Sequence, residues 1–285
     1  NGIVSGLDYN NSAGTNNPAD AGAQFKYDVT TLYIQNEFFA TDDITLMLGL
    51  RYDRWSSDDT PRLNQNFTQR YGYENTANVD GIDLLQPRVG LNWAVSDNLE
   101  IRGGVGLYSG GNPNVWISNA YSNDGVTNIS TNERDITLPD GQDNIQLFDL
   151  QLVGQGRPIR DIPAELFNIV ADTSLETGDG NTVATDPNFK IPSEWKYAIG
   201  ATYVTDNDYV ITADYIFTNK EDSAVYRDAN LTLEQGASIL FDGRLQPGRI
   251  DTGRRAGSDY VLGNARTGDG KSHVVSIGVS KEWDN

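Results

Sequence analysis

Hydrophobic and polar residues alternate along several segments of this chain. In the stretch FATDDITLMLGLRYDRW (39–55), Ile44, Leu46 and Leu48 share one parity, whereas Arg51 and Asp53 share the other. A period of two predicts a β-strand that is apolar on one face and polar on the other. The same pattern predicts strands at about 27–39, 44–55, 85–95, 99–109, 194–204, 209–219 and 273–283. Each is 11–13 residues long, which exceeds the ~5 to 6 residues usual in globular proteins.

The connections between these strands fall into two classes. Strands one and two, three and four, and five and six are joined by only three or four residues, ATDD, SDN and TDND. Asp and Asn suit such turns because they tolerate turn conformations and bond to the nearby backbone. The alternate connections are long loops, 56–84, 110–193 and 220–272. An antiparallel up-and-down sheet would therefore carry its short turns at one end and its long loops at the other.

This sorting of the connections favours one fold class over another. Loops longer than ~12 to 15 residues are uncommon in compact soluble domains, whereas outer-membrane barrels combine short periplasmic turns with long extracellular loops. A tilted strand needs ~9 to 11 residues to cross a membrane, and these strands are long enough. We therefore expect an all-β, antiparallel up-and-down transmembrane β-barrel in the bacterial outer membrane. Because bacterial single-chain barrels have even strand numbers and an open sheet edge is costly in lipid, we expect these seven strands to be a segment of a larger barrel.

Aromatic residues near the strand ends predict two interfacial belts. The belt at the short-turn end would contain Phe38, Phe39, Trp93, Tyr203, Tyr209 and Trp283. The belt at the long-loop end would contain Tyr27, Tyr52, Trp55, Tyr108, Trp195, Tyr197, Tyr215 and Phe217. Trp55 is expected to mark the outer membrane interface.

The parity opposite the apolar one predicts a charged wall that faces the lumen. It contains Glu37, Arg51, Asp53, Gln86, Arg88, Gly90, Asn92, Glu100, Arg102, Gly104, Gly106, Lys196 and Asp214. On a soluble sheet the same residues would form only the solvated face. Because the sorting of short and long connections favours a barrel, we expect these residues to face its lumen.

The composition argues against several classes of function. The formal net charge of −19 over 285 residues would repel the phosphates of a nucleic acid, so no nucleic-acid partner is expected. The chain has no Cys and one His, His273, which excludes thiolate metal sites and nearly excludes a Ser-His-Asp triad. We expect neither an enzyme nor a cofactor. Loop 110–193 has twelve acidic and four basic residues, which fits either attraction of cationic ligands or plain solubility.

Three stretches carry a resemblance to a known family. TTLYIQNEFFATDDITLMLGLRYDRW resembles the strand-turn-strand signature of TonB-dependent outer-membrane receptors, and LLQPRVGLNWAVSDNLEIRGGVGLYSGG resembles the next hairpin. YVLGNARTGDGKSHVVSIGVSKEWDN is similar to a later hairpin strand in the Oar-like branch, whose members carry a carboxypeptidase-regulatory-like domain ahead of the plug. The resemblance covers roughly 25–109 and 190–285.

The resemblance implies a 22-stranded barrel that is filled by an N-terminal plug domain and takes up a scarce ligand with energy delivered by TonB. The sequence contains neither a plug nor a TonB box nor a signal peptide, so we expect residues 1–285 to be part of the barrel alone. The implied partners are outer-membrane lipid, the plug of the same parent chain, TonB through the missing N-terminal part, and an unknown small molecule, peptide or oligosaccharide.

Six residues are candidates for contact with the plug or the ligand. Four are the inner-wall cations Arg51, Arg88, Arg102 and Lys196. The other two, Trp116 and Tyr121 in NVWISNAYSNDG, are candidate ligand-stacking groups or simple loop anchors. The stretch 160–172, with Pro163 near its start, predicts a short helix.

Two other functions remain open from the sequence. One is an outer-membrane adhesin that shares the barrel but lacks transport. The other is a soluble or surface β-sheet protein that binds glycans or protein partners through its long loops. This last protein would fold without detergent, whereas a barrel segment would require detergent or a bilayer.

Overall fold

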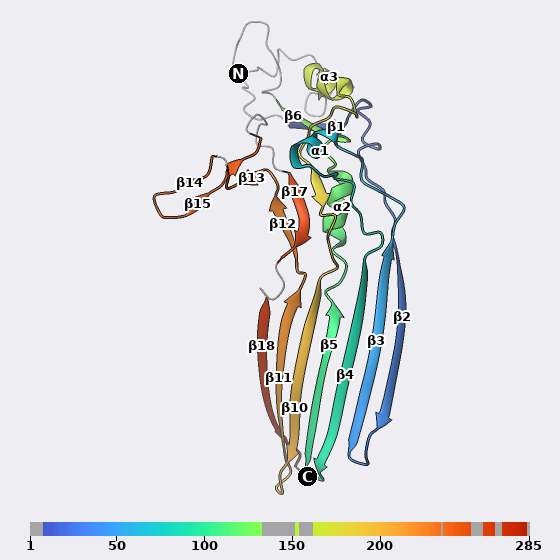
Figure 1. Cartoon of the computed structure of the whole chain (residues 1–285), viewed down its shortest axis with the longest axis vertical. Helices are drawn as coiled ribbons and strands as arrows, with labels where there is room; N and C mark the ends of the chain where they lie inside the picture. The colour runs from blue at the N-terminus through green and yellow to red at the C-terminus, as the bar shows by residue number, and fades with distance from the viewer. Residues whose placement is uncertain are drawn as a thin grey trace.

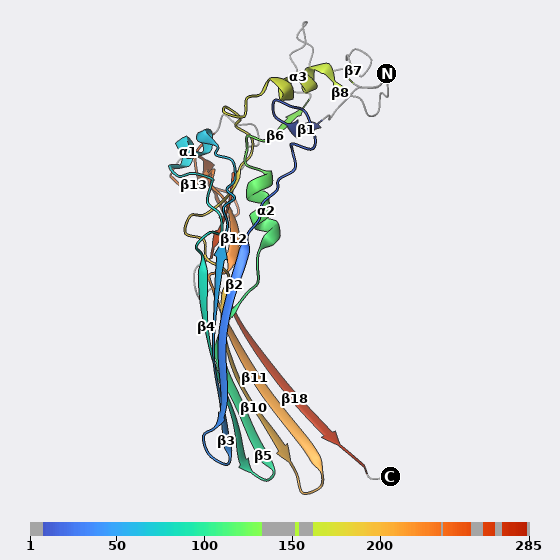
Figure 2. The same cartoon turned by 90° about the vertical axis from the view of Figure 1, so that its right-hand side faces the viewer.

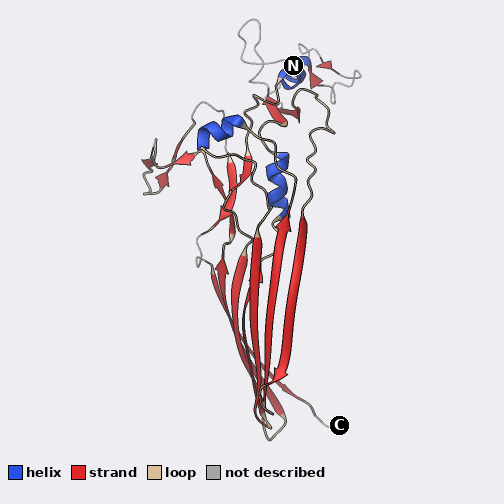
Figure 3. Ribbon diagram, turned by 45° about the vertical axis from the view of Figure 1, so that its right-hand side comes forward, coloured by secondary structure: helices blue, strands red, loops and turns tan. Residues whose placement is uncertain are grey.

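A computed structural model describes residues 8–132, 152–153, 162–234, 236–251, 259–265 and 270–283. Its main feature is one tall, curved antiparallel sheet with a folded body of loops at one end (Figure 1, Figure 2). Within these residues, helices occur only in the loop part, above the sheet (Figure 3). Among the described residues, none of the helices is long and apolar enough to cross a membrane.

Seven strands form the tall sheet, in the order β18-β11-β10-β5-β4-β3-β2. They are β2 (Asp28–Phe39), β3 (Ile44–Ser56), β4 (Asp83–Ser96), β5 (Leu99–Ser109), β10 (Ser193–Val204), β11 (Tyr209–Glu221) and β18 (Lys271–Lys281). All seven predicted strands are confirmed to within two residues at each end. The sheet is open in the described residues, and β2 and β18 are its edges.

The short connections lie at the bottom of the sheet in Figure 1, and the long ones lie at the top. The turn between β4 and β5 is two residues rather than three, because β4 continues through Ser96 past a register shift. In the turn before β11, Asp208 has a φ of 63°, a left-handed conformation that Asp tolerates better than most residues. The predicted sorting of connections is confirmed.

The strand register separates an apolar face from a polar face. Leu32, Tyr52 and Leu85 are cross-strand neighbours on one face, and paired residues of neighbouring strands share a face. By this register the apolar face carries Leu46, Leu48, Leu50, Val89, Leu91, Ile101, Val105, Ile199, Ile211, Val275, Ile277 and Val279. Several of these large side chains are exposed, Ile277 by 73%. Such a band of exposed apolar residues on a sheet is what a lipid-facing barrel wall presents.

The long connections are not structureless, as the term loop implied. They contain α1 (Gln65–Tyr71), α2 (Asn114–Ser122) and α3 (Ala164–Asp172). The helix expected within 160–172 is present as α3, whereas α1 and α2 were not foreseen. These connections also contain the short strands β6 (Asn128–Asn132), β7 (Leu152–Val153), β8 (Ile162–Pro163), β9 (Val183–Thr185), β12 (Ala224–Asp228), β13 (Leu231–Thr232), β14 (Ser238–Ile239), β15 (Leu245–Gln246), β16 (Gly248–Arg249) and β17 (Tyr260–Asn264). A further short strand, β1 (Asp8–Ser12), precedes β2 in the chain and pairs with β6.

The three long connections fold together into one unit, which we call the loop body. Strand β17 of the third connection pairs with β12 of the same connection and, in parallel, with β9 of the second. A shared apolar core contains Trp55, Val79, Ile117, Tyr121, Phe189, Ile191 and Leu262. Each of these side chains contributes roughly 1.5 to 3 kcal/mol when fully buried. The core therefore draws on β3 and on all three connections.

Trp55 corrects one expectation. It has the same parity as Arg51 and Asp53, and its cross-strand partner is Val29. Its side chain is 3% exposed, and its indole Nε1 donates to Asn112 Oδ1 at 3.1 Å. Trp55 is therefore a core residue where the inner face meets the loop body and does not mark the outer interface.

Candidate functional site

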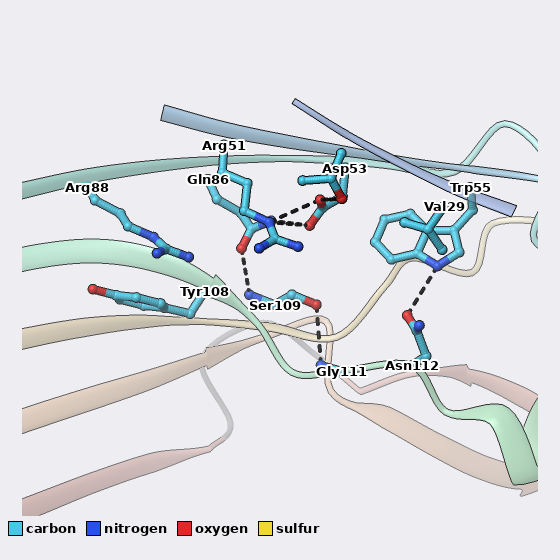
Figure 4. Close-up of a pocket in the computed structure, with 11 residues that line it drawn as sticks. Val29, Arg51, Asp53, Trp55, Gln86, Arg88, Tyr108, Ser109, Gly111 and Asn112 are labelled. Carbon is cyan, nitrogen blue, oxygen red and sulfur yellow. Dashed lines mark hydrogen bonds and ion pairs between the residues drawn. The ribbon is translucent and has the colours of Figure 1, made fainter. Parts of the chain in front are cut away.

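The candidate site is a cavity of about 480 Å³ at the top of the polar face, where β3, β4 and β5 meet the loop body (Figure 4). Its lining includes strand residues and the segment that leads from β5 to α2: Val29, Thr31, Arg51, Asp53, Trp55, Gln86, Arg88, Tyr108, Ser109, Gly111 and Asn112. A smaller cavity of about 260 Å³ adjoins it and shares Arg51 and Arg88. Two of the four predicted inner-wall cations therefore line the same space.

Asp53 is the centre of a buried hydrogen-bond network on one side of the cavity. Its carboxylate accepts from Arg51 Nε at 3.0 Å, from Thr31 Oγ1 at 2.7 Å and from Gln86 Nε2 at 2.6 Å. Gln86 Oε1 in turn accepts from the backbone N–H of Ser109 at 3.0 Å. The buried side chains of Asp53 and Gln86 thus have their hydrogen-bond partners. The network ties β2, β3 and β4 to the upper end of β5.

Tyr108 holds two cations on the other side of the cavity. The guanidinium carbon of Arg88 lies 4.5 Å from the ring centroid, and Lys196 Nζ lies 5.6 Å from it, distances at which a cation is attracted by an aromatic face. A Cβ on Gly106 would lie 3.0 Å from the Tyr108 ring and 3.1 Å from Arg88 Cγ. The absence of a side chain at Gly106 therefore makes room for this stack.

Arg102 belongs to a different part of the wall. Its guanidinium pairs with Asp214 Oδ1 at 2.6 Å and donates to Thr202 Oγ1 at 2.8 Å. By register it neighbours Asn92 and Gly200, nearer the short turns. Lys196 is also paired, to Glu194 Oε1 at 2.8 Å. The structure thus brings Arg51 and Arg88 into one cavity, places Lys196 against the Tyr108 ring and leaves Arg102 apart.

The two candidate stacking groups in α2 have different environments. Tyr121 is 8% exposed, stacks on Phe25 with ring centroids 4.3 Å apart, and donates its hydroxyl to the backbone oxygen of Asp59. It is a core residue and is not open to a ligand. Trp116 is 37% exposed and lines a second cavity of about 450 Å³ on the far side of Gly111 and Asn112. Only Trp116 retains a position suited to stacking.

An ion cluster joins the three long connections above these cavities. Helix α1 starts at the cap Asn64, which accepts from Phe67 N–H, and ends at Gly72, so that Arg70 lies in its last turn. Arg70 contacts Asp179 of the second connection at 2.5 Å, and Asp251 and Asp259 of the third at 3.3 and 2.9 Å. Burial alone would lower the pKa of Arg70, but the hydrogen bond and charge of Asp179 and the charge of Asp259 raise it. Arg70 therefore stays charged and binds the connections together.

The tyrosines of the loop body make it sensitive to alkaline pH. Burial and a hydrogen bond to Asp259 raise the pKa of the Tyr71 hydroxyl, and burial raises the pKa of Tyr73, Tyr121 and Tyr226. Because the folded state holds these protons more tightly, their stabilisation is complete below the unfolded pKa of about 10 and is lost as the pH rises through the raised values.

We therefore expect the loop body to lose stability as the pH rises above about 10, with tyrosine ionisation and opening occurring together. Tyrosinate absorbance and limited proteolysis, followed on the same samples, measure both events. Tyr71→Phe should make the transition less steep. Ionisation of all tyrosines near their ordinary pKa with the loop body still protected would contradict the prediction.

Tyr108 lies on a different face from the one predicted, although the sequence carried a usable signal. Tyr108 was placed in an interfacial belt because it is aromatic and near a strand end. Its parity matches that of Glu100 and Arg102, and its partner across β10 is Glu194. Asn112 gave no signal, because its contact with Trp55 depends on how the segment after β5 folds back.

The open antiparallel sheet, its exposed apolar band and its sorted connections define a membrane β-barrel protein. The sequence matches the family described as "Outer membrane beta barrel domain" over residues 6–267, and the chain belongs to that family. Its location is the bacterial outer membrane. No curated protein matches the sequence at a significant level.

Solved structures resemble the chain at low sequence identity. The siderophore receptor PirA from Acinetobacter baumannii aligns with a TM-score of 0.46 and 10% identity, over 91% of this chain and 26% of the receptor. The outer membrane transporter YddB from Escherichia coli aligns with a TM-score of 0.43 and 14% identity, over 89% of this chain and 22% of the transporter. The FrpB iron transporter from Neisseria meningitidis aligns with a TM-score of 0.40 and 14% identity, over 93% of this chain and 26% of the transporter. The chain thus spans about a quarter of the length of these proteins.

Proposed function

We propose that this chain is the ligand-recognising part of the barrel of a TonB-dependent receptor of the Oar-like branch, and that the intact protein takes up its ligand with energy from TonB. The observation that carries the proposal is the pairing of a polar inner wall with a folded loop body directly above it. If the polar face were only a solvent-exposed face of the sheet, a cavity between it and the loop body, at the end where ligand would enter, would not be expected.

The open sheet supports a larger barrel. Strands β2 and β18 each present one edge that is unpaired among the described residues. Each unsatisfied backbone group costs several kcal/mol in lipid. Further strands of a parent chain would satisfy these edges and enclose the polar face, and a plug would then face Arg51, Arg88, Arg102 and Lys196. The apolar band would contact outer-membrane lipid.

Binding to TonB tests the energy-coupled part of this proposal. We expect the intact parent protein, folded in detergent, to bind the purified periplasmic domain of TonB, as measured by calorimetry. The parent protein with its TonB-contacting segment deleted serves as the matched control and should show no binding. A parent protein that fails to bind TonB would favour an adhesin that uses the same barrel and loop body for attachment.

A further inference from the structure

The cavity at the top of the polar face is a positively charged place in an acidic chain. The formal net charge is −19, yet the charged side chains that line the cavity are Arg51, Arg88 and one carboxylate, Asp53. Arg51 and Gln86 are direct cross-strand neighbours, so Arg88, two residues on, is the diagonal neighbour of Arg51. Diagonal neighbours on one face lie roughly 7 to 8 Å apart, a separation that a small anion can bridge.

Asp53 cannot neutralise both arginines. Its side chain is 3% exposed and already accepts hydrogen bonds from Arg51, Thr31 and Gln86. Only Nε of Arg51 takes part in this contact, and the Arg51 side chain remains 44% exposed. The guanidinium of Arg51 therefore reaches the cavity with donors to spare, since an arginine carries five N–H groups.

Arg88 lacks an acceptor in the described part of the chain. Its Nε is buried without a hydrogen-bond partner, and its guanidinium is held only by the Tyr108 ring. A buried donor without an acceptor costs about 1 to 3 kcal/mol. Figure 4 shows Arg51 and Arg88 extending from β3 and β4 toward the same cavity. One anion between the two guanidinium groups would reduce their mutual repulsion and accept a hydrogen bond from the unsatisfied Nε–H of Arg88.

We propose that Arg51 and Arg88 form a binding site for a carboxylate group, with Tyr108 as the platform that holds Arg88. Planar guanidinium groups match the two oxygens of a carboxylate. Lys196 and Arg102 contribute less, because Glu194 and Asp214 already pair with them. This site rests on the proposed function, in which the polar face lines the lumen. It specifies a carboxylate as the group that this face binds.

A cysteine in the cavity tests the site, since the chain has no other cysteine. Ser109 lines the cavity, and Ser280 of β18, on the polar face and outside the cavity lining, provides the control. We expect Ser109→Cys to react faster with an anionic sulfonatoethyl methanethiosulfonate than with its cationic trimethylammonium analogue, by about tenfold relative to Ser280→Cys. Citrate should slow the reaction at Ser109→Cys more than sodium chloride of equal ionic strength.

Second substitutions assign the effect to the two arginines. Arg88→Gln or Arg51→Gln in the Ser109→Cys background should abolish both the anion preference and the protection by citrate. Arg102→Gln should preserve both. Arg88→Gln keeps the test valid if Arg51→Gln disturbs the Asp53 network. Equal reaction rates with the two reagents, or protection that survives Arg88→Gln, would overturn the proposal.

The carboxylate can belong to a plug side chain or to a solute, and the intact parent protein distinguishes the two. If Ser109→Cys is unreactive in the parent without added citrate, the plug supplies the group. If it is reactive and citrate protects it, a solute does. Failure of the parent to bind TonB would leave either result standing, so the two proposals fail separately.

Discussion

Leu48→Arg should prevent most of the protein from assembling in the outer membrane, whereas Met47→Arg should have little effect. Leu48 lies midway along β3 on the apolar face, between Asn36 and Val89 of the neighbouring strands. Met47 is the adjacent residue and lies on the polar face, between Glu37 and Gly90. An arginine on the lipid face near the bilayer midplane costs about 2 to 4 kcal/mol, whereas lumen substitutions mainly tune selectivity.

The two variants make a matched pair, because the same side chain is introduced at neighbouring positions of one strand. Membrane fractionation of expressing cells and urea titration of protein folded into phospholipid vesicles measure the difference. Equal losses in both variants would show that the two faces do not differ in environment. A folded, monodisperse monomer in plain buffer would instead support the soluble β-sheet alternative.

Arg70→Met should cost the loop body about 3 kcal/mol, since removal of one partner leaves the other buried and unpaired. The Asp259 side chain is fully buried, and the Arg70 side chain is 9% exposed. Asp259 also accepts from Tyr71 Oη at 2.7 Å and from the backbone N–H of Thr182 at 2.9 Å. The loss of Arg70 therefore weakens all three connections at once.

Hydrogen exchange of the backbone amides in β9 and β17 measures this effect as a free energy of local opening. Arg227→Met is the control, because Arg227 also pairs with a carboxylate, Asp186, but its side chain is 58% exposed. Exposed pairs contribute about 0 to 1 kcal/mol. If Arg70→Met costs no more than Arg227→Met, the ion cluster does not hold the connections together.

Much of the fold could be predicted because strand periodicity is a local property. Alternation over 11 to 13 residues placed all seven tall strands, and turn chemistry placed the three short connections. Parity alone placed Arg51, Asp53, Gln86 and Arg88 on one face, because successive side chains of a strand point to opposite sides. Trp55 and Tyr108 were misplaced when residue type was given more weight than parity.

The loop body and the grouping of the cations depended on contacts between distant segments. Arg70 is 109 residues from Asp179 and 189 from Asp259 in the sequence, and no local pattern reports such a pairing. The same holds for Tyr121, which reads as an exposed loop aromatic until Phe25 is found against it. The sequence by itself determined the strands, their faces and the end at which the loops gather, since each follows from neighbours along the chain. Only the tertiary structure decided that Arg51 and Arg88 share a cavity while Arg102 is paired elsewhere, because strand register and loop packing bring those side chains together.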